Sequence, residues 1–324
     1  MLPLNTEMNI MKPQNSNSTP HHSFSTQNSD IENESLESLL ARLENEDSEK
    51  VENEDISVNH EKLKGIITDL ESDLASGKWI NTFYANIDLR MMPALVKQAN
   101  TKYPEMNLKL ALTPQELVWS IKETINSGVQ SSRFIVNLGG SRIHFAVIDH
   151  QTVADKTSLL LLEPTSFENG SAAMMGLRTK KALQDSDLSH YSFSMAEMNI
   201  QRSTSECGIF SLALAKKLYL ESDKLKKMHT DNVNGVLSDP ESAYLSSDKL
   251  DQYLPITLYK HTQSTKRLKQ YVKANPGSEH KSINKKEETL FERFEKNLTL
   301  KEDKAFSVST HKKRISEYKS LLKL

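Results

Sequence analysis

The chain has 324 residues, of which 37% are hydrophobic and 26% are charged, so one substantial domain or two small ones can bury a core without disulfides or metals. This composition excludes fibrous, collagen-like and wholly disordered proteins. The single cysteine, Cys207, excludes a disulfide framework, a CxxC redox pair and a zinc site with several thiolate ligands. We therefore predict no disulfide and no metal site.

The formal net charge of −2 conceals a strong polarity along the chain. Residues 1–57 contain 3 Lys or Arg against 12 Asp or Glu, whereas residues 260–324 contain 17 against 8. A basic carboxyl-terminal region can bind nucleic acid, an anionic small molecule or the chain's own acidic parts. Composition alone leaves these three open.

No apolar run approaches the roughly 18 residues that a membrane-spanning helix requires, and the best one, residues 159–162, is of strand length. Residues 1–17 lack the basic and apolar segments of a secretory signal peptide. The sequence predicts a soluble chain in reducing conditions, where a free cysteine persists.

Residues 1–30, rich in Asn, Ser, Thr, Pro and His, are expected to be disordered because they cannot bury enough apolar surface to offset chain entropy. Apolar residues then recur at helical spacing in four segments, at 36–43, 66–74, 91–100 and 114–125. Thr113 is the expected N-cap of the last segment, with Pro114 at its first helical position.

The period then changes to that of β-strands, which we expect at residues 133–138, 143–148, 157–162 and 191–200. A helix follows at 207–220. Further helices are expected at 223–237, 262–274, 286–298 and 309–322. The sequence shows no internal repeat. The predicted fold class is α+β, a small core sheet framed by helices.

Cys207 lies at the predicted start of a helix, where backbone N–H groups and the helix dipole stabilise a thiolate. A nucleophilic cysteine needs an imidazole to take its proton and an acid to orient the imidazole. His144 within a predicted strand and Glu163 at the end of the next one are placed to meet on one face of the sheet. Gln201 is placed to donate its side-chain amide, beside the Cys207 backbone N–H, to an oxyanion.

Each of these residues also has an ordinary structural interpretation. A single cysteine is more often a small buried apolar residue than a nucleophile. Taken alone, His144 is a core or edge histidine, Glu163 a solvated strand end and Gln201 a polar residue leaving a strand. The residues taken singly leave both interpretations open.

The order His144, Glu163, Gln201, Cys207 resembles that of the Ulp-like clan of cysteine peptidases. Longer segments resemble the YopJ family of bacterial type III effectors, close to its YopJ- and AvrA-type members. These segments are residues 134–137, 177–180, 200–203, 205–218, 251–263 and 311–319. The resemblance runs from about residue 61 to the carboxyl end and does not include residues 1–57.

The resemblance implies a peptidase-like core used for acetyl transfer. Acetyl-coenzyme A would acylate Cys207, with His144 as the base, Glu163 as the acid that orients it and Gln201 as an oxyanion donor. The acetyl group would then pass to Ser, Thr or Lys side chains of host signalling kinases such as MAP kinase kinases and block their activation. The expected coenzyme A contacts are His144, Arg178, Lys180, Arg202, Ser203 and Lys217.

The basic carboxyl-terminal region has few aromatic residues of the kind that stack on bases and no RNP-like or helix-turn-helix pattern, so nucleic acid is a poor fit. Basic side chains spread over several helices suit a compact polyanion. The resemblance implies that this polyanion is inositol hexakisphosphate, an activator of the family. The expected ligands are Lys260, His261, Arg267, Lys285, Lys286, Arg293, Lys312, Lys313 and Arg314. Lys260 is also the candidate self-acetylation site, against a phosphate-contacting or solvated lysine.

The resemblance also implies four regions. These are a disordered leader with a type III secretion signal at 1–57, an amino-terminal helical part of the regulatory region and core at 58–130, a catalytic core at 131–258 and a basic helical regulatory region at 259–324. A type III system would deliver the chain into the host cytoplasm, and a secretion chaperone is a further candidate partner. Two other functions stay open: a cysteine protease of ubiquitin-like conjugates, which would use the same four residues, and a non-catalytic kinase-binding module.

Overall fold

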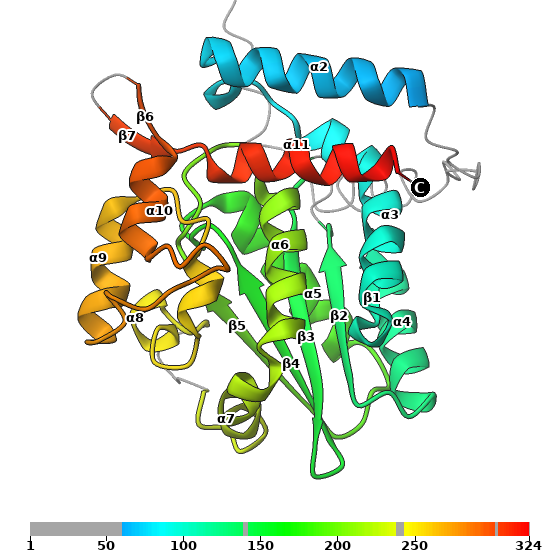
Figure 1. Cartoon of the computed structure of the whole chain (residues 1–324). Coiled ribbons are helices and arrows are strands. Elements are labelled where there is room, and N and C mark those ends of the chain that lie inside the picture. Colours follow the sequence, from blue (N-terminus) through cyan, green and yellow to red (C-terminus); the bar gives the residue numbers. More distant parts are fainter. Residues whose placement is uncertain (1–59, 139–141, 238–242, 302–303, 324) are drawn as a thin grey trace, which may run out of the picture. The chain divides into compact units, whose positions relative to one another are not determined.

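The computed structural model describes residues 60–138, 142–237, 243–301 and 304–323, so the leader predicted at 1–57 and the helix predicted at 36–43 lie outside the described residues. A five-stranded mixed sheet lies at the centre of the described part (Figure 1). The middle three strands are antiparallel neighbours, and each outer strand pairs in parallel with the strand beside it. In pairing order the strands are β1 (Leu108–Ala111), β2 (Ser131–Val136), β3 (Ala146–Val153), β4 (Lys156–Glu163) and β5 (Tyr191–Glu197).

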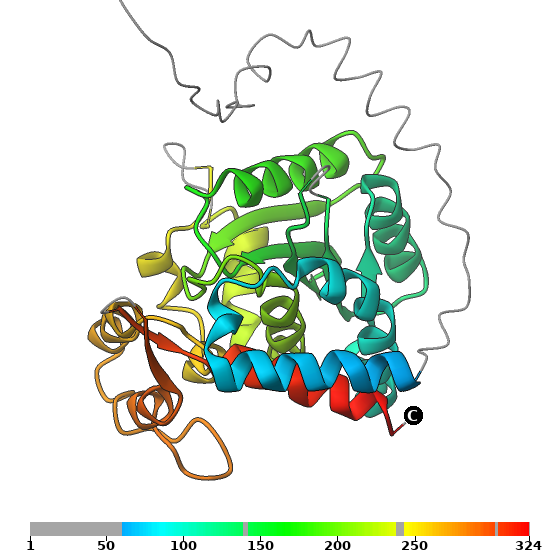
Figure 2. The same cartoon turned by 90° about the horizontal axis from the view of Figure 1, so that it is seen from above.

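Helices cover both faces of the sheet because its strands bury side chains in both directions. In β4, Leu160 and Leu162 pack into the core that contains α3, α6 and α7. Leu159 and Leu161 point the other way and pack with α4 and α5, as the two-residue period of a strand requires. Figure 2 shows the sheet between these layers. The helices are α3 (Ala85–Lys102), α4 (Pro114–Asn126), α5 (Gly170–Gln184), α6 (Cys207–Leu220) and α7 (Ser222–Val233).

Two helices from opposite ends of the described chain, α2 (His60–Ser76) and α11 (Ser309–Leu321), lie side by side (Figures 1 and 2). His311 Nε2 lies 3.0 Å from the carbonyl oxygen of Leu70, and Lys319 Nζ lies 2.5 Å from Glu71 Oε1. Because α11 also packs against α3 and α6, the last helix of the chain is joined directly to the layer that contains Cys207.

The remaining elements are short: α8 (Ser247–Leu250), the 3₁₀ turn η3 (Ile256–Tyr259), α9 (Thr265–Ala274), α10 (Leu290–Lys296) and a hairpin of β6 (Leu298–Lys301) and β7 (Lys304–Ser307). Two further 3₁₀ turns, η1 (Lys78–Ile80) and η2 (Pro104–Met106), flank α3. The Ser264 side chain caps α9, and Thr289 forms a capping box with Glu292 at α10. With these caps, α9 begins three residues later than the predicted start at 262, and α10 begins four residues later than the predicted start at 286.

The predicted α+β class is confirmed, and the helices predicted at 66–74, 91–100, 114–125 and 207–220 lie within α2, α3, α4 and α6. Thr113 caps α4 by accepting a hydrogen bond from the Glu116 N–H. The helix predicted to reach residue 237 ends at Val233, because Gly235 takes a positive φ of 74° and the chain turns there. The prediction missed β1, α5 and the β6–β7 hairpin.

Two predicted strands are wrong at the ends that matter for the site. The strand predicted at 143–148 begins at Ala146, where β2 also ends, so His144 precedes β3 and its backbone N–H donates to Asn137 Oδ1 instead. The strand predicted at 191–200 ends at Glu197, because Asn199 adopts a left-handed φ of 54°. Gln201 therefore lies in the loop after β5.

Candidate active site

Cys207 begins helix α6 and is buried, with 2% of its surface exposed. The next residue, Gly208, allows helix α3 to lie close against the first turn of α6. A Cβ atom on Gly208 would lie 3.1 Å from Asp88 Cβ and 3.2 Å from Met92 Cε, both in α3. Glycine at this position therefore lets α3 pack tightly against the first turn of α6 and fixes the place of the thiol.

His144 lies between the cysteine and a carboxylate. Its Nε2 is 2.9 Å from Glu163 Oε2, and the Cys207 side chain on its other side is near enough to affect its charge. Burial lowers the pKa of His144, but the charge of Glu163 and the interaction with Cys207 outweigh burial and raise this pKa to about 10. The imidazole is therefore held as an imidazolium beside the cysteine, a state that stabilises a thiolate.

Glu163 is the last residue of β4 and is fully buried. Its second oxygen, Oε1, accepts two hydrogen bonds from Thr165, at 2.8 Å from the backbone N–H and 2.7 Å from the hydroxyl. One carboxylate oxygen thus serves His144 and the other is fixed by Thr165. Thr165 was not predicted as a site residue from the sequence, although Thr side chains commonly hydrogen-bond to groups a few residues away.

A thiol, an imidazole and a carboxylate placed in this order form the arrangement that nucleophilic acyl chemistry requires. The structure brings together His144, Glu163 and Cys207, which come from the segment just before β3, the end of β4 and the start of α6. Within the described residues, no group of His, Cys, Asp and Glu is suited to hold a metal ion. The described helices also include none with the length and apolarity to cross a bilayer.

A basic pocket of about 330 Å³ lies where the segment after η3 meets α10 and α11. Six of the nine predicted polyanion ligands line it: Lys260, His261, Lys286, Arg293, Lys312 and Lys313. Lys296, which was not predicted, lines it as well. Glu288 also lies in the lining, where its carboxylate pairs with Arg293 at 3.3 Å and Lys296 at 2.7 Å.

Comparison with known proteins gives the family. A family model described as YopJ Serine/Threonine acetyltransferase matches residues 63–320. The chain belongs to this family. It is 54% identical over 267 residues to the serine/threonine-protein acetyltransferase YopJ of Yersinia pestis, covering 82% of this chain and 92% of that protein. These findings confirm the family predicted from the sequence.

Solved structures agree with this assignment. The chain is 52% identical to AvrA, which was solved with CoA and with IP6, the abbreviation for inositol hexakisphosphate. The two structures superpose with a TM-score of 0.79, and the match covers 83% of this chain and 100% of the solved AvrA chain. HopZ1a, solved in complex with IP6 and CoA, matches with a TM-score of 0.64 over 81% of this chain and 98% of its own. At 19% identity, HopZ1a shows a shared fold.

In this YopJ-family chain, Gln201 lies close in sequence to the nucleophile but donates its Nε2 to the Ser203 carbonyl at 2.8 Å. Its Oε1 is buried and has no hydrogen-bond partner among the described residues. The oxyanion role of Gln201 stays a prediction, since it requires the amide to turn from Ser203 toward a bound acyl oxygen.

The predicted coenzyme A contacts fall into separate places. Arg202 and Ser203 lie in the loop just before Cys207. Lys217 lies in the last turn of α6, about 15 Å from Cys207 along the helix axis. Arg178 and Lys180 belong to α5, on the opposite face of the sheet from α6, and Arg178 donates to the Leu138 carbonyl at 3.0 Å. The structure does not gather these residues into one site.

Two predicted polyanion ligands lie outside the basic pocket because their guanidinium groups are used inside the protein. Arg267 is buried and pairs with Asp251, at 2.7 Å from Nη1 and 2.5 Å from Nη2. Arg314 is fully buried and pairs with Asp88 through two bonds of 2.9 Å. A third, Lys285, is exposed beside Lys286 and does not line the pocket.

The cations of the basic pocket repel one another. Burial, followed by the charges of Arg293, Lys217 and Lys313, lowers the pKa of Lys260 to about 8. An anion that entered the pocket would relieve this repulsion, so the pocket is electrostatically prepared for a ligand with several negative charges.

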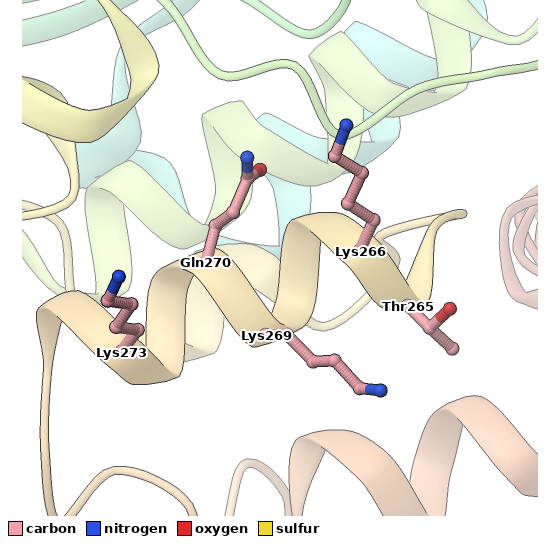
Figure 3. Close-up of a pocket in the computed structure, with 5 residues that line it drawn as sticks. All are labelled: Thr265, Lys266, Lys269, Gln270 and Lys273. Atoms are coloured by element: carbon pink, nitrogen blue, oxygen red, sulfur yellow. The ribbon is translucent and has the colours of Figure 1, made fainter.

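A larger hollow of about 430 Å³ lies along α9 and is lined by Thr265, Lys266, Lys269, Gln270 and Lys273 (Figure 3). All five residues come from one helix, and Lys269 points to the opposite side of it from Lys266 and Lys273. None of the residues of the candidate active site lines this hollow. The hollow along α9 is therefore separate from the candidate active site around Cys207.

Proposed function

We propose that this chain transfers an acetyl group from acetyl-coenzyme A, through a thioester on Cys207, to Ser, Thr and Lys side chains of host signalling kinases such as MAP kinase kinases, and so blocks their activation. The observation that carries this proposal is the His144–Glu163 pair with Cys207 beside the imidazole, in a chain of the YopJ Serine/Threonine acetyltransferase family. Further support comes from the relative AvrA, which was solved with CoA.

Two balanced steps follow from the geometry. The Cys207 thiolate attacks the acetyl carbonyl carbon, and the thiolate of coenzyme A leaves with the proton that His144 gives up. A substrate hydroxyl then attacks the acetyl-cysteine, His144 takes the hydroxyl proton, and the Cys207 thiolate leaves. Glu163 keeps the imidazole oriented and stabilises its charged form in both steps. Gln201 and the Cys207 backbone N–H are the proposed donors to the oxyanion.

We also propose that the basic pocket binds inositol hexakisphosphate as an activator. Lys260, Lys286, Arg293, Lys312 and Lys313 approach it from three different segments, which suits a ligand with phosphates on all sides. AvrA and HopZ1a were both solved with IP6. Lys260 is the proposed self-acetylation site, because its lowered pKa of about 8 leaves part of its amine neutral and nucleophilic near neutral pH.

The arrangement of the chain supports the predicted regions. His144, Glu163 and Cys207 fall within the proposed catalytic core at 131–258, and the polyanion ligands fall within the proposed regulatory region at 259–324. The packing of α11 against α2 and α3 joins that region to the helices of 58–130. We propose residues 1–57 as the leader for type III delivery into the host cytoplasm, which a translocation assay with a reporter fused to this segment tests.

The direct test of function is the intact mass of a purified MAP kinase kinase after incubation with the chain and acetyl-coenzyme A, with and without inositol hexakisphosphate. We expect increments of about 42 Da, the mass of one acetyl group, that require Cys207 and His144. Cys207→Ala and His144→Ala serve as inactive controls. A cleaved kinase or ubiquitin-like conjugate without such increments would instead indicate a protease using the same residues.

A further inference from the structure

The side chain of Gln263, from a distant part of the chain, hydrogen-bonds to the loop that leads into Cys207. Gln263, which is 1% exposed, accepts hydrogen bonds at its Oε1 from the backbone N–H groups of Arg202, at 2.6 Å, and Ser203, at 2.9 Å. Its backbone N–H donates to the Ile200 carbonyl at 2.9 Å. This loop is neither strand nor helix, so contacts of this kind fix its course.

The same side chain reaches the residue next to the nucleophile. Nε2 of Gln263 donates to Oε2 of Glu206, the residue directly before Cys207. The Ser203 hydroxyl donates to the same oxygen at 2.8 Å. Glu206 is buried, with 1% exposed, and thus depends on these partners to satisfy its carboxylate.

Glu206 is held on its other side by α11. Arg314 Nη1 lies 3.4 Å from Glu206 Oε1, and Arg314 Nη2 donates to the Ser205 carbonyl at 2.9 Å. The turn immediately before Cys207 is therefore fixed between Gln263 and Arg314, neither of which contacts His144 or Glu163 in any bond found in the described residues.

We propose that Gln263 is a positioning residue for catalysis, which sets the angle at which Cys207 meets His144 by joining the backbone of residues 202–203 to the carboxylate of Glu206. The expected effect on kcat rests on the proposed acetyl transfer, whereas the expected effect on the reactivity of the Cys207 thiol does not. A displacement on the order of 1 Å at a reacting group lowers a rate by as much as about 100-fold, so a small shift of this turn is enough to be measured.

Exchange of the two side chains gives a specific test. Gln263→Glu keeps the acceptor for the backbone N–H groups but removes the donor to Glu206 and sets two carboxylates against each other. The double variant Gln263→Glu/Glu206→Gln restores one donor and one acceptor across the pair with the net charge of the wild type. Gln270→Glu, at an exposed position on α9 (Figure 3), is the matched control for the added charge.

Three quantities are measured: the rate of Cys207 alkylation by iodoacetamide, kcat and KM for acetyl transfer, and the unfolding temperature. We expect Gln263→Glu to lower the alkylation rate and kcat by about tenfold or more with little change in KM for acetyl-coenzyme A. The exchanged pair should recover most of both rates, and Gln270→Glu should match the wild type. If Gln263→Glu does not fold, Gln263→Met replaces it, with the same loss expected.

Wild-type values for alkylation and kcat in a folded Gln263→Glu or Gln263→Met variant would overturn the proposal. So would losses in the single variant that the exchanged pair does not recover, since these would indicate packing alone. If the wild type is alkylated at Cys207 but transfers no acetyl group, the proposed function fails, and the alkylation rates of the variants still decide this inference.

Discussion

Thr165 holds the Glu163 carboxylate through two hydrogen bonds to the single oxygen that His144 does not use. The carboxylate plane, and with it the orientation of the His144 ring, therefore depends on a residue outside the triad. Orientation of the imidazole is the main service of the acid in such triads.

Thr165→Val tests this dependence, because it keeps the branched shape and the backbone N–H but removes the hydroxyl. We expect kcat for acetyl transfer to fall about three- to tenfold, the effect of losing one hydrogen bond of typical net strength. Thr165→Ser keeps the hydroxyl and should stay close to the wild type. Steady-state kinetics measure the difference, and equal rates for Thr165→Val and Thr165→Ser would contradict it.

Charge reversal in the basic pocket should weaken binding of inositol hexakisphosphate. Lys312 lines the pocket and donates to Asn297 at its wall. For Lys312→Glu we expect the Kd measured by titration calorimetry to rise about tenfold or more. Lys269→Glu makes the same charge change on α9, outside the pocket, and should bind like the wild type. The difference should shrink at high salt because of screening; equal affinities for the two variants at low salt would refute the assignment.

The buried pair of Arg314 and Asp88 should matter to stability far more than a surface pair on the same helix. Tyr318 also donates to Asp88, at 2.7 Å, so Arg314→Met leaves the buried Asp88 carboxylate with one partner fewer, and it also removes the contacts of Arg314 with Glu206 and the Ser205 carbonyl. We expect it to lower the free energy of unfolding by about 3–5 kcal/mol. Lys319→Met, which removes the exposed pair with Glu71, should cost at most about 1 kcal/mol. Urea denaturation measures both, and similar costs would show that the buried pair is not a main support.

Acid should destabilise the chain partly through His311. Burial is the largest influence on its pKa and lowers it to about 4, below the ordinary value of 6.5. The neutral ring therefore adds stability that is fully present above about pH 6.5 and is lost as the pH falls toward 4. In His311→Gln this part of the slope should disappear, whereas His280→Gln, at an exposed position, should keep it. Denaturation curves between pH 7 and 4 give the slopes, and a wild-type slope in His311→Gln would contradict this.

The sequence was sufficient to predict the helix that begins at Cys207, because an apolar helical pattern starts directly after a polar loop. It also predicted that His144 and Glu163 come from neighbouring strand regions. The predicted strand at 143–148 began too early because Ile143 and Phe145 are apolar but lie beyond the last residue of β2 that can pair. An apolar pattern in the sequence indicates which residues are buried, but the end of a strand is set by where its hydrogen-bonded neighbour ends.

Contacts between distant segments were not predictable. Gln263 meets a loop about 60 residues earlier in the chain, and no local spacing indicates this. Arg314 is different, since it shares one face of α11 with Ile315, Tyr318 and Leu321, which are all buried. That spacing indicates a buried guanidinium, but Arg314 was predicted as a polyanion ligand because it lies among the other basic residues of the carboxyl-terminal region.

The central claim, that Cys207 carries the acetyl group, is tested most directly by the mass of the Cys207 peptide after brief incubation with acetyl-coenzyme A, an acid quench and proteolysis. We expect an increment of about 42 Da on this peptide that neutral hydroxylamine removes, as it does from a thioester. His144→Ala should show little or none of this increment. Acetylated kinase in a reaction with Cys207→Ala, or acetyl groups only on Ser, Thr or Lys of the wild-type chain with Cys207 unmodified at every quench time, would contradict the account.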